Sequence, residues 1–219
     1  MDAHPAGIGH IRTLGIVTGI LLALAGVSGA LATLGLLGSY FVPMNESAVY
    51  FYGTVAIALI IFIGASLLCI PLVAWWFWQA HRNLKEAGVS GLRYTPGWAA
   101  GGFFIPFLNL IVPLRVAREL AIRSEGEDQY QSDMEVPILS GWWAAHIAGL
   151  IVAGVIAVIA LLEFLTPFFV TMPDEALVLL MVLATGFLGA SALCLALAIR
   201  KITRAQIARR HLGHADVFA

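Results

Sequence analysis

The feature that most constrains this chain is a set of four long apolar runs, each longer than the roughly 20 residues that a helix needs to cross the hydrocarbon core of a bilayer. The runs occupy residues 14–41, about 52–78, about 138–165 and about 176–199. They are continuous rather than alternating, which favours helices over the strands of a membrane barrel. With 60% hydrophobic and 11% charged residues, the composition excludes an ordinary soluble domain. We therefore predict an all-α integral membrane protein with four transmembrane helices.

The basic residues indicate how these helices are oriented. All 12 lie before the first run, between the second and third runs, or after the fourth run. Four spans place every one of them on the same side, which the positive-inside rule makes cytoplasmic. The six tryptophans also lie near the cytoplasmic ends, where an amphipathic ring prefers the interface. This predicts a cytoplasmic N-terminus at 1–13, a single membrane domain at 14–199 and a basic cytoplasmic tail at 200–219.

The beginning of the chain also shows some features of a signal peptide. Arg12 is followed by a short apolar stretch and by the small residues Ala30-Leu31-Ala32. The apolar run continues past this triplet, which favours a helix that stays in the membrane over one that is cleaved. Cleavage of the first span remains an open alternative.

The segment 96–114 decides whether there is a fifth span. Residues 94–114 carry no charge, yet they include Pro106, Asn109 and Pro113. In a straight helix each proline would leave a backbone carbonyl without its donor, which is costly in hydrocarbon. A crossing would also place eight basic residues outside and leave four inside. We therefore predict a re-entrant or interfacial segment, and whether it dips into the bilayer or lies along it stays open.

Several short motifs follow one another in a fixed order after the second run. They are WQAHRNL at 78–84, TPGWA at 95–99, Pro106 and Pro113 flanking Asn109-Leu110, REL at 118–120 and WW at 142–143. Over about residues 52–200 the chain thereby resembles the bacterial membrane family called domain of unknown function 4328. It departs from that family at Leu114 and Ala121, where an aromatic residue and a tryptophan are frequent. The resemblance implies a multi-pass protein of the bacterial plasma (inner) membrane and no assigned reaction.

Polar residues at membrane depth are the candidates for a solute pathway or for structural polar contacts. Together with the two prolines beside Asn109 and the polar residues after the second span, the set is His81, Arg82, Asn83, Pro106, Asn109, Pro113 and His146. The amide of Asn109 suits the carbonyls that the two prolines free, and the alternative is contact with a solute or an ion. His146 lies in the third run beside small residues, which favours packing, and proton handling or ligand contact is the alternative.

Basic residues next to amphipathic sequence suggest contact with anionic lipid headgroups. Residues 113–124 have the pattern of a short amphipathic helix along the inner surface. The predicted lipid-facing basic residues are Arg115, Arg118, Arg200, Lys201, Arg204, Arg209 and Arg210. The alternative is that the residues from 200 onward continue the fourth helix in solvent. Orientation already explains this charge pattern, so nucleic-acid binding is not expected.

No motif in the sequence identifies a reaction. HExxH, GxSxG and phosphate-binding glycine patterns are missing, and we expect no metal and no cofactor. We interpret the chain as a non-enzymatic packing or assembly protein of the membrane. The main alternative is a small channel or transporter whose pathway is lined by Pro106 to Pro113. A third and weaker interpretation is an intramembrane enzyme that uses His81 or His146. Gly15 and Gly19 favour close helix packing, and a homo-oligomer is the alternative.

Overall fold

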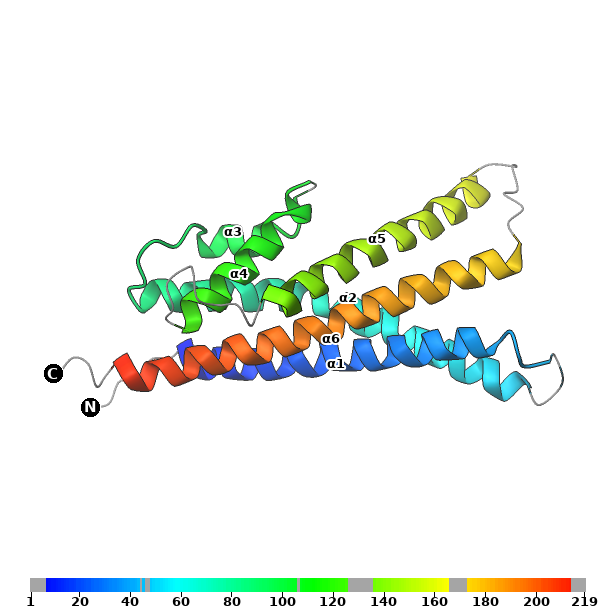
Figure 1. Cartoon of the computed structure of the whole chain (residues 1–219), viewed down its shortest axis with the longest axis horizontal. Helices are drawn as coiled ribbons and strands as arrows, with labels where there is room; N and C mark the ends of the chain where they lie inside the picture. Colours follow the sequence, from blue (N-terminus) through cyan, green and yellow to red (C-terminus); the bar gives the residue numbers. More distant parts are fainter. Residues whose placement is uncertain are drawn as a thin grey trace. The chain divides into compact units, whose positions relative to one another are not determined.

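The computed structural model describes residues 7–43, 45, 48–105, 107–125, 136–165 and 173–213. These residues form helices joined by turns, and Figure 1 follows them along the chain from blue to red. The elements are α1 (Gly7–Gly38), α2 (Ala48–Glu86), α3 (Pro96–Gly101), η1 (Leu108–Leu110), α4 (Val112–Glu125), α5 (Val136–Leu165) and α6 (Asp174–Gly213).

Helices α1, α2, α5 and α6 are long and apolar enough to cross a membrane. This confirms the prediction of an all-helical, multi-pass membrane protein. All four begin before their predicted spans, α1 by seven residues at Gly7, and two also continue past them, since α2 ends at Glu86 and α6 at Gly213. Residues 200–213, which we assigned to a tail, therefore continue the fourth helix, and the rest of the tail lies outside the described residues.

The chain divides into two compact units, and the long helices contribute to both. Unit 1 comprises Met1–Leu22, Leu68–Ser140 and Cys194–Ala219. Unit 2 comprises Ala23–Leu67 and Gly141–Leu193. All 12 basic residues of the sequence belong to the ranges of unit 1, and none belongs to unit 2. The two units therefore differ sharply in charge.

Small residues let the helices of unit 2 approach one another closely. A Cβ atom added at Gly26 of α1 would lie 2.4 Å from Cγ of Leu193 and 3.1 Å from the carbonyl oxygen of Gly189, both on α6. Two turns further along α1, Thr33 shares a hydrogen bond of 2.8 Å with Thr185 of α6. Each hydroxyl also lies within hydrogen-bonding distance of a carbonyl of its own helix. One threonine therefore donates to the other, which in turn donates to its carbonyl, and both hydroxyls are satisfied in apolar surroundings. Glycine and threonine thus define the α1–α6 contact in this unit.

The same principle explains Gly15 in unit 1. A Cβ atom there would meet the side-chain oxygen of Thr203 at 2.7 Å, whereas at Gly19 no atom lies within 4 Å. Gly15 is therefore a close-packing position inside the unit, as its spacing predicted.

We expect Gly26→Ala to destabilise the protein by about 1–3 kcal/mol, because the added methyl group has to displace Leu193 and press on the backbone of α6. Gly64→Ala is the matched control in the same unit, since its Cβ would meet nothing within 4 Å. That change should be neutral or stabilising by up to about 1 kcal/mol, because alanine favours the helix. Unfolding of both variants in detergent micelles measures the difference, and equal effects would contradict the close approach at Gly26.

Candidate functional site

The polar side chains of unit 1 gather where α2, α4 and α6 meet the segment that joins α2 to α4. That segment begins with a capped helix, because Thr95 precedes Pro96 and its hydroxyl accepts a hydrogen bond from the Trp98 N–H at 3.4 Å. At the end of α3 the chain turns at the buried Gly102. A Cβ atom there would lie 2.5 Å from Cγ1 of Val112, so glycine allows α3 to approach the start of α4.

Between these helices the backbone takes an unusual conformation. Phe107 has a φ of 64° and a ψ of −40°, which is a strained conformation for a residue with a Cβ. It precedes the single turn η1, in which the Asn109 N–H donates to the Ile105 carbonyl at 2.9 Å. The Asn109 side chain is half-buried, and its predicted role as a partner for freed carbonyls stays a prediction. Pro106 lies outside the described residues, whereas Pro113 is buried in the first turn of α4.

Helix α4 buries one face and exposes the other, and it covers the predicted amphipathic stretch 113–124. The buried residues are Val112, Pro113, Val116, Ala117, Leu120, Ala121 and Ser124. Their spacing of three and four residues forms one stripe along the helix. Protein atoms of unit 1 cover this stripe, so the apolar face of α4 packs within the unit.

One carboxylate connects α4 to two other parts of unit 1. The Glu119 side chain is 12% exposed, and its Oε2 lies 3.1 Å from Nε2 of the fully buried His81 on α2. Its Oε1 accepts a hydrogen bond from the backbone N–H of Arg93, in the connection between α2 and α3. Glu119 therefore connects α2, the connection and α4 through a single side chain. We refer to His81, Glu119 and the Arg93 backbone as the carboxylate hub.

The surroundings of Glu119 favour its charged form. Partial burial by itself would raise the pKa of this carboxyl group, but the hydrogen bonds from His81 and from the backbone of Arg93 and Tyr94, with the charge on His81, outweigh it and lower the pKa. On the other side of the ring, His81 Nδ1 is buried and finds no hydrogen-bond partner among the described residues.

Helix α6 also contacts α2 and α4 in this part of unit 1. Gln206 Nε2 donates both to the Ala80 carbonyl at 3.2 Å and to Oγ of Ser124 on α4 at 3.0 Å. Trp76 Nε1 on α2 donates to Oγ1 of Thr203 at 3.1 Å. Thr203 and Gln206 follow the predicted fourth span, so the part of α6 beyond that span is packed within unit 1.

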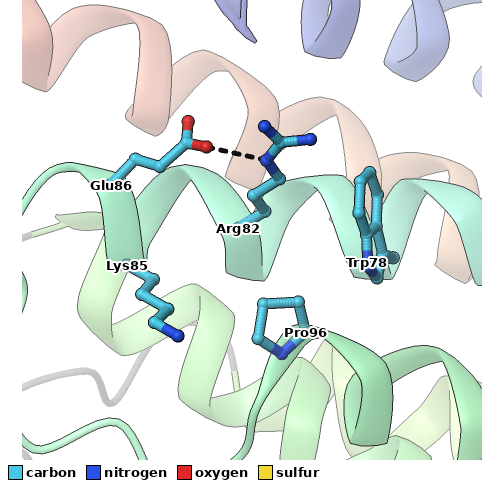
Figure 2. Close-up of a pocket in the computed structure, with 5 residues that line it drawn as sticks. All are labelled: Trp78, Arg82, Lys85, Glu86 and Pro96. Atoms are coloured by element: carbon cyan, nitrogen blue, oxygen red, sulfur yellow. Dashed lines mark hydrogen bonds and ion pairs between the residues drawn. The ribbon is translucent and has the colours of Figure 1, made fainter.

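The remaining candidates on α2 form short contacts along its own surface. Arg82 Nε donates to Oε1 of Glu86 at 2.7 Å, and its guanidinium carbon lies 5.2 Å from the centroid of the Trp78 ring (Figure 2). Asn83 Oδ1 accepts a hydrogen bond from Gln79 Nε2 at 2.9 Å. His81, Arg82 and Asn83 are adjacent in sequence, but only the first of them belongs to the carboxylate hub.

His146 lies in unit 2, apart from these groups. Its Nδ1 is 3.5 Å from Oγ of Ser191, and its ring stacks on Trp143 with the centroids 5.4 Å apart. These contacts fit the packing interpretation of this histidine. Trp143 lies three residues earlier on the same helix, as helical spacing predicts, whereas the sequence supplied no signal for Ser191.

The predicted lipid-facing basic residues divide into two groups. Arg118 is half-buried, and its Nη2 donates to Oγ of Ser140 at 2.9 Å, so this side chain is engaged within unit 1. The exposed members are Arg115, Arg200, Lys201 and Arg204. The side chains of Arg209 and Arg210 lie outside the described residues, and contact of this set with lipid stays a prediction.

Glu119 is the functional candidate that the sequence interpretation missed. It is the single acidic residue between Arg93 and Arg123, and it belongs to the REL motif at 118–120. Those signals could have marked it, but its pairing with a histidine 38 residues away could not be read from the sequence. Among the described residues, no group of three or more His, Cys, Asp or Glu side chains is arranged to hold a metal ion.

Comparison with protein families agrees with the motifs. The model of the family described as Domain of unknown function (DUF4328) matches residues 43–204. The chain belongs to this family. The DUF4328 match contains all of the carboxylate hub and Thr203, and it ends just before Gln206. No curated protein and no solved structure matches the chain.

We expect Glu119→Ala to reduce stability by about 1–3 kcal/mol, because it leaves the buried His81 ring and a backbone N–H without their acceptor. Glu86→Ala is the matched control, since that carboxylate pairs with Arg82 at the surface, where both side chains are about half exposed. An exposed pair of this kind contributes at most about 1 kcal/mol. Thermal unfolding in micelles compares the two variants, and a larger loss for Glu86→Ala would contradict the hub.

The hub should also give the protein an acid-sensitive component of stability. Since the folded-state pKa of Glu119 lies below its ordinary value of 4.5, its charge contributes stability that is fully present above that value. The contribution is lost as the pH falls through the folded-state pKa. The stability difference between the wild type and Glu119→Gln should therefore shrink on acidification, as measured by unfolding at a series of pH values. A difference independent of pH would show that the charge of Glu119 is irrelevant.

Proposed function

We propose that this protein is a non-enzymatic packing and assembly protein of the bacterial inner membrane, and that residues 104–111 are its contact with lipid. The observation that carries the proposal is a run of exposed apolar side chains in this short stretch. Its exposed members are Phe104, Ile105, Phe107, Leu108, Leu110 and Ile111, and Phe107 is 83% exposed. We call these six residues the apolar loop.

The apolar loop is attached to unit 1 at both ends. Before it, the Phe103 ring packs on Phe77 of α2 with the centroids 5.0 Å apart. After it, Val112 is buried at the start of α4. An anchored loop cannot hide its apolar side chains by collapsing onto itself, and each large side chain gains about 1.5–3 kcal/mol when it leaves water. A bilayer provides that environment next to a chain with four helices able to span it.

The polar contacts of unit 1 support a structural role. Glu119 binds His81 and the backbone N–H of Arg93, and Gln206 and Trp76 hold α6 to its neighbours. Side chains that are engaged in this way stabilise helix contacts instead of turning toward a substrate. The collection of all basic residues in unit 1 supports an orientation with this unit on the cytoplasmic side. Association of several copies through the same membrane surfaces is part of the proposal.

The channel alternative rests on one observation, the half-buried amide of Asn109 within the apolar loop's sequence. A water-filled pathway along residues 106–113 would require more polar lining than one amide among large apolar side chains. We therefore favour lipid as the neighbour of this segment.

Site-directed labelling of the reconstituted protein tests the proposal. In a background with Cys69 and Cys194 replaced by alanine, a spin label at position 107 should be relaxed strongly by oxygen dissolved in lipid and weakly by a water-soluble nickel complex. Ser90 is the matched control, because it is exposed in the connection between α2 and α3 and carries a polar side chain. A label there should respond mainly to the nickel complex.

Two results would overturn the assignment. Relaxation of the label at 107 mainly by the nickel complex would exclude lipid contact. Water access at position 109, together with solute flux in liposomes that Asn109→Ala abolishes, would establish the channel instead.

A further inference from the structure

A small cleft lies in unit 1 between the last turns of α2 and the start of α3. It has a volume of about 390 Å³ and is lined by Trp78, Arg82, Lys85, Glu86 and Pro96 (Figure 2). Cavities of a few hundred Å³ match the size of small ligands. None of the lining residues belongs to the carboxylate hub or to the apolar loop, so the cleft is a separate feature of the unit.

Two contacts orient Arg82 at the cleft. Its Nε donates to Glu86 at 2.7 Å, and its guanidinium lies against the Trp78 ring at 5.2 Å from the centroid. A guanidinium has five N–H donors in a rigid fork, and the bond to Glu86 uses the one on Nε. The terminal amino groups therefore stay available, in the geometry that suits two oxygens of one anion.

Lys85 supplies a second cation on the side of the cleft next to Pro96, as Figure 2 shows. It is exposed and lies three residues after Arg82 on the same helix. With Glu86 already paired to Arg82, the cleft carries two cations and one carboxylate. The net charge of +1 matches a singly charged phosphate ester.

The position of the cleft along α2 indicates where such an ester would come from. From Ala48 to His81 this helix contains no Asp, Glu, Lys or Arg, and Arg82 is its first charged residue. Trp78, one turn earlier, is the residue type that prefers the boundary between hydrocarbon and water. Lipid phosphates lie at this same boundary, which makes a lipid headgroup the expected source of a phosphate for Arg82 and Lys85.

We propose that the cleft binds the phosphate of a phospholipid headgroup. The terminal amino groups of Arg82 contact the phosphate oxygens, Lys85 adds positive charge from the side of the cleft next to Pro96, and the Trp78 ring packs on the glycerol part of the lipid (Figure 2). This site is distinct from the apolar loop, and it shares with the proposed function only the placement of the chain in a membrane. Failure of either proposal therefore leaves the other one standing.

Lipid binding to the full-length protein in a neutral detergent tests the site. Native mass spectrometry counts bound phosphatidylglycerol as the lipid is added in steps. The double variant Arg82→Gln/Lys85→Gln should weaken the tightest binding about thirtyfold, at roughly fivefold for each cation near a phosphate. Arg12→Gln/Arg93→Gln is the matched control, because it removes the same charge from exposed positions outside both the cleft and the predicted lipid-facing set, and it keeps the backbone N–H of Arg93. That variant should bind as the wild type does.

A third variant, Trp78→Leu, should weaken binding through loss of the ring that orients Arg82. Unchanged thermal midpoints, measured in the same detergent, ensure that each variant is folded. Equal losses in the two double variants would overturn the proposal, since they would indicate diffuse attraction between charges. Unchanged binding in Arg82→Gln/Lys85→Gln would overturn it as well.

Two further ligands identify the chemistry and its source. The first is a phosphate-free galactolipid with the same acyl chains, and Arg82→Gln/Lys85→Gln should leave its binding unchanged. If that variant weakened galactolipid binding as well, the assignment to phosphate would be wrong. Soluble glycerol phosphate should displace phosphatidylglycerol only at far higher concentration, because it lacks the acyl chains. Displacement at equal concentration would show that a free phosphate ester, rather than a lipid, is the ligand.

Discussion

The arrangement of unit 1 depends on one carboxylate in a largely apolar protein. Glu119 is the side chain through which α2, the connection after it and α4 are joined, with His81 and the Arg93 backbone as its partners. A carboxylate in such surroundings is tolerated only while its oxygens are hydrogen-bonded, so its contacts are cooperative and directional. With α4 fixed in this way, its buried stripe packs in one register, and the start of α4 fixes one end of the apolar loop.

Much of this fold follows from patterns that can be counted along the sequence. The length of the apolar runs predicted four helices able to span a bilayer, since the thickness of a membrane imposes that length. The threonine and proline at 95 and 96 similarly mark the start of α3, where the hydroxyl caps the first turn. These features are local, which is why the sequence alone suffices to find them.

The contacts within the candidate site depend instead on which residues meet in three dimensions. Asn109 and His146 stood out because polar residues at membrane depth are costly, yet they lie in different units. Glu119 looked like an ordinary surface residue of an amphipathic helix, since periodicity gives the face that a residue occupies but not the partner opposite it. For the same reason the extension of α6, with Thr203 and Gln206 packed on α2 and α4, could not be told from a solvated continuation of the helix.

The strained backbone at Phe107 places two requirements in opposition. A residue with a Cβ at positive φ costs roughly 1–2 kcal/mol, and glycine would relieve that cost. Glycine would also remove an 83% exposed aromatic ring from the apolar loop. At this position, then, the chain is locally frustrated. Glycine would suit the turn but would present no apolar side chain to a bilayer, whereas phenylalanine presents one and strains the turn.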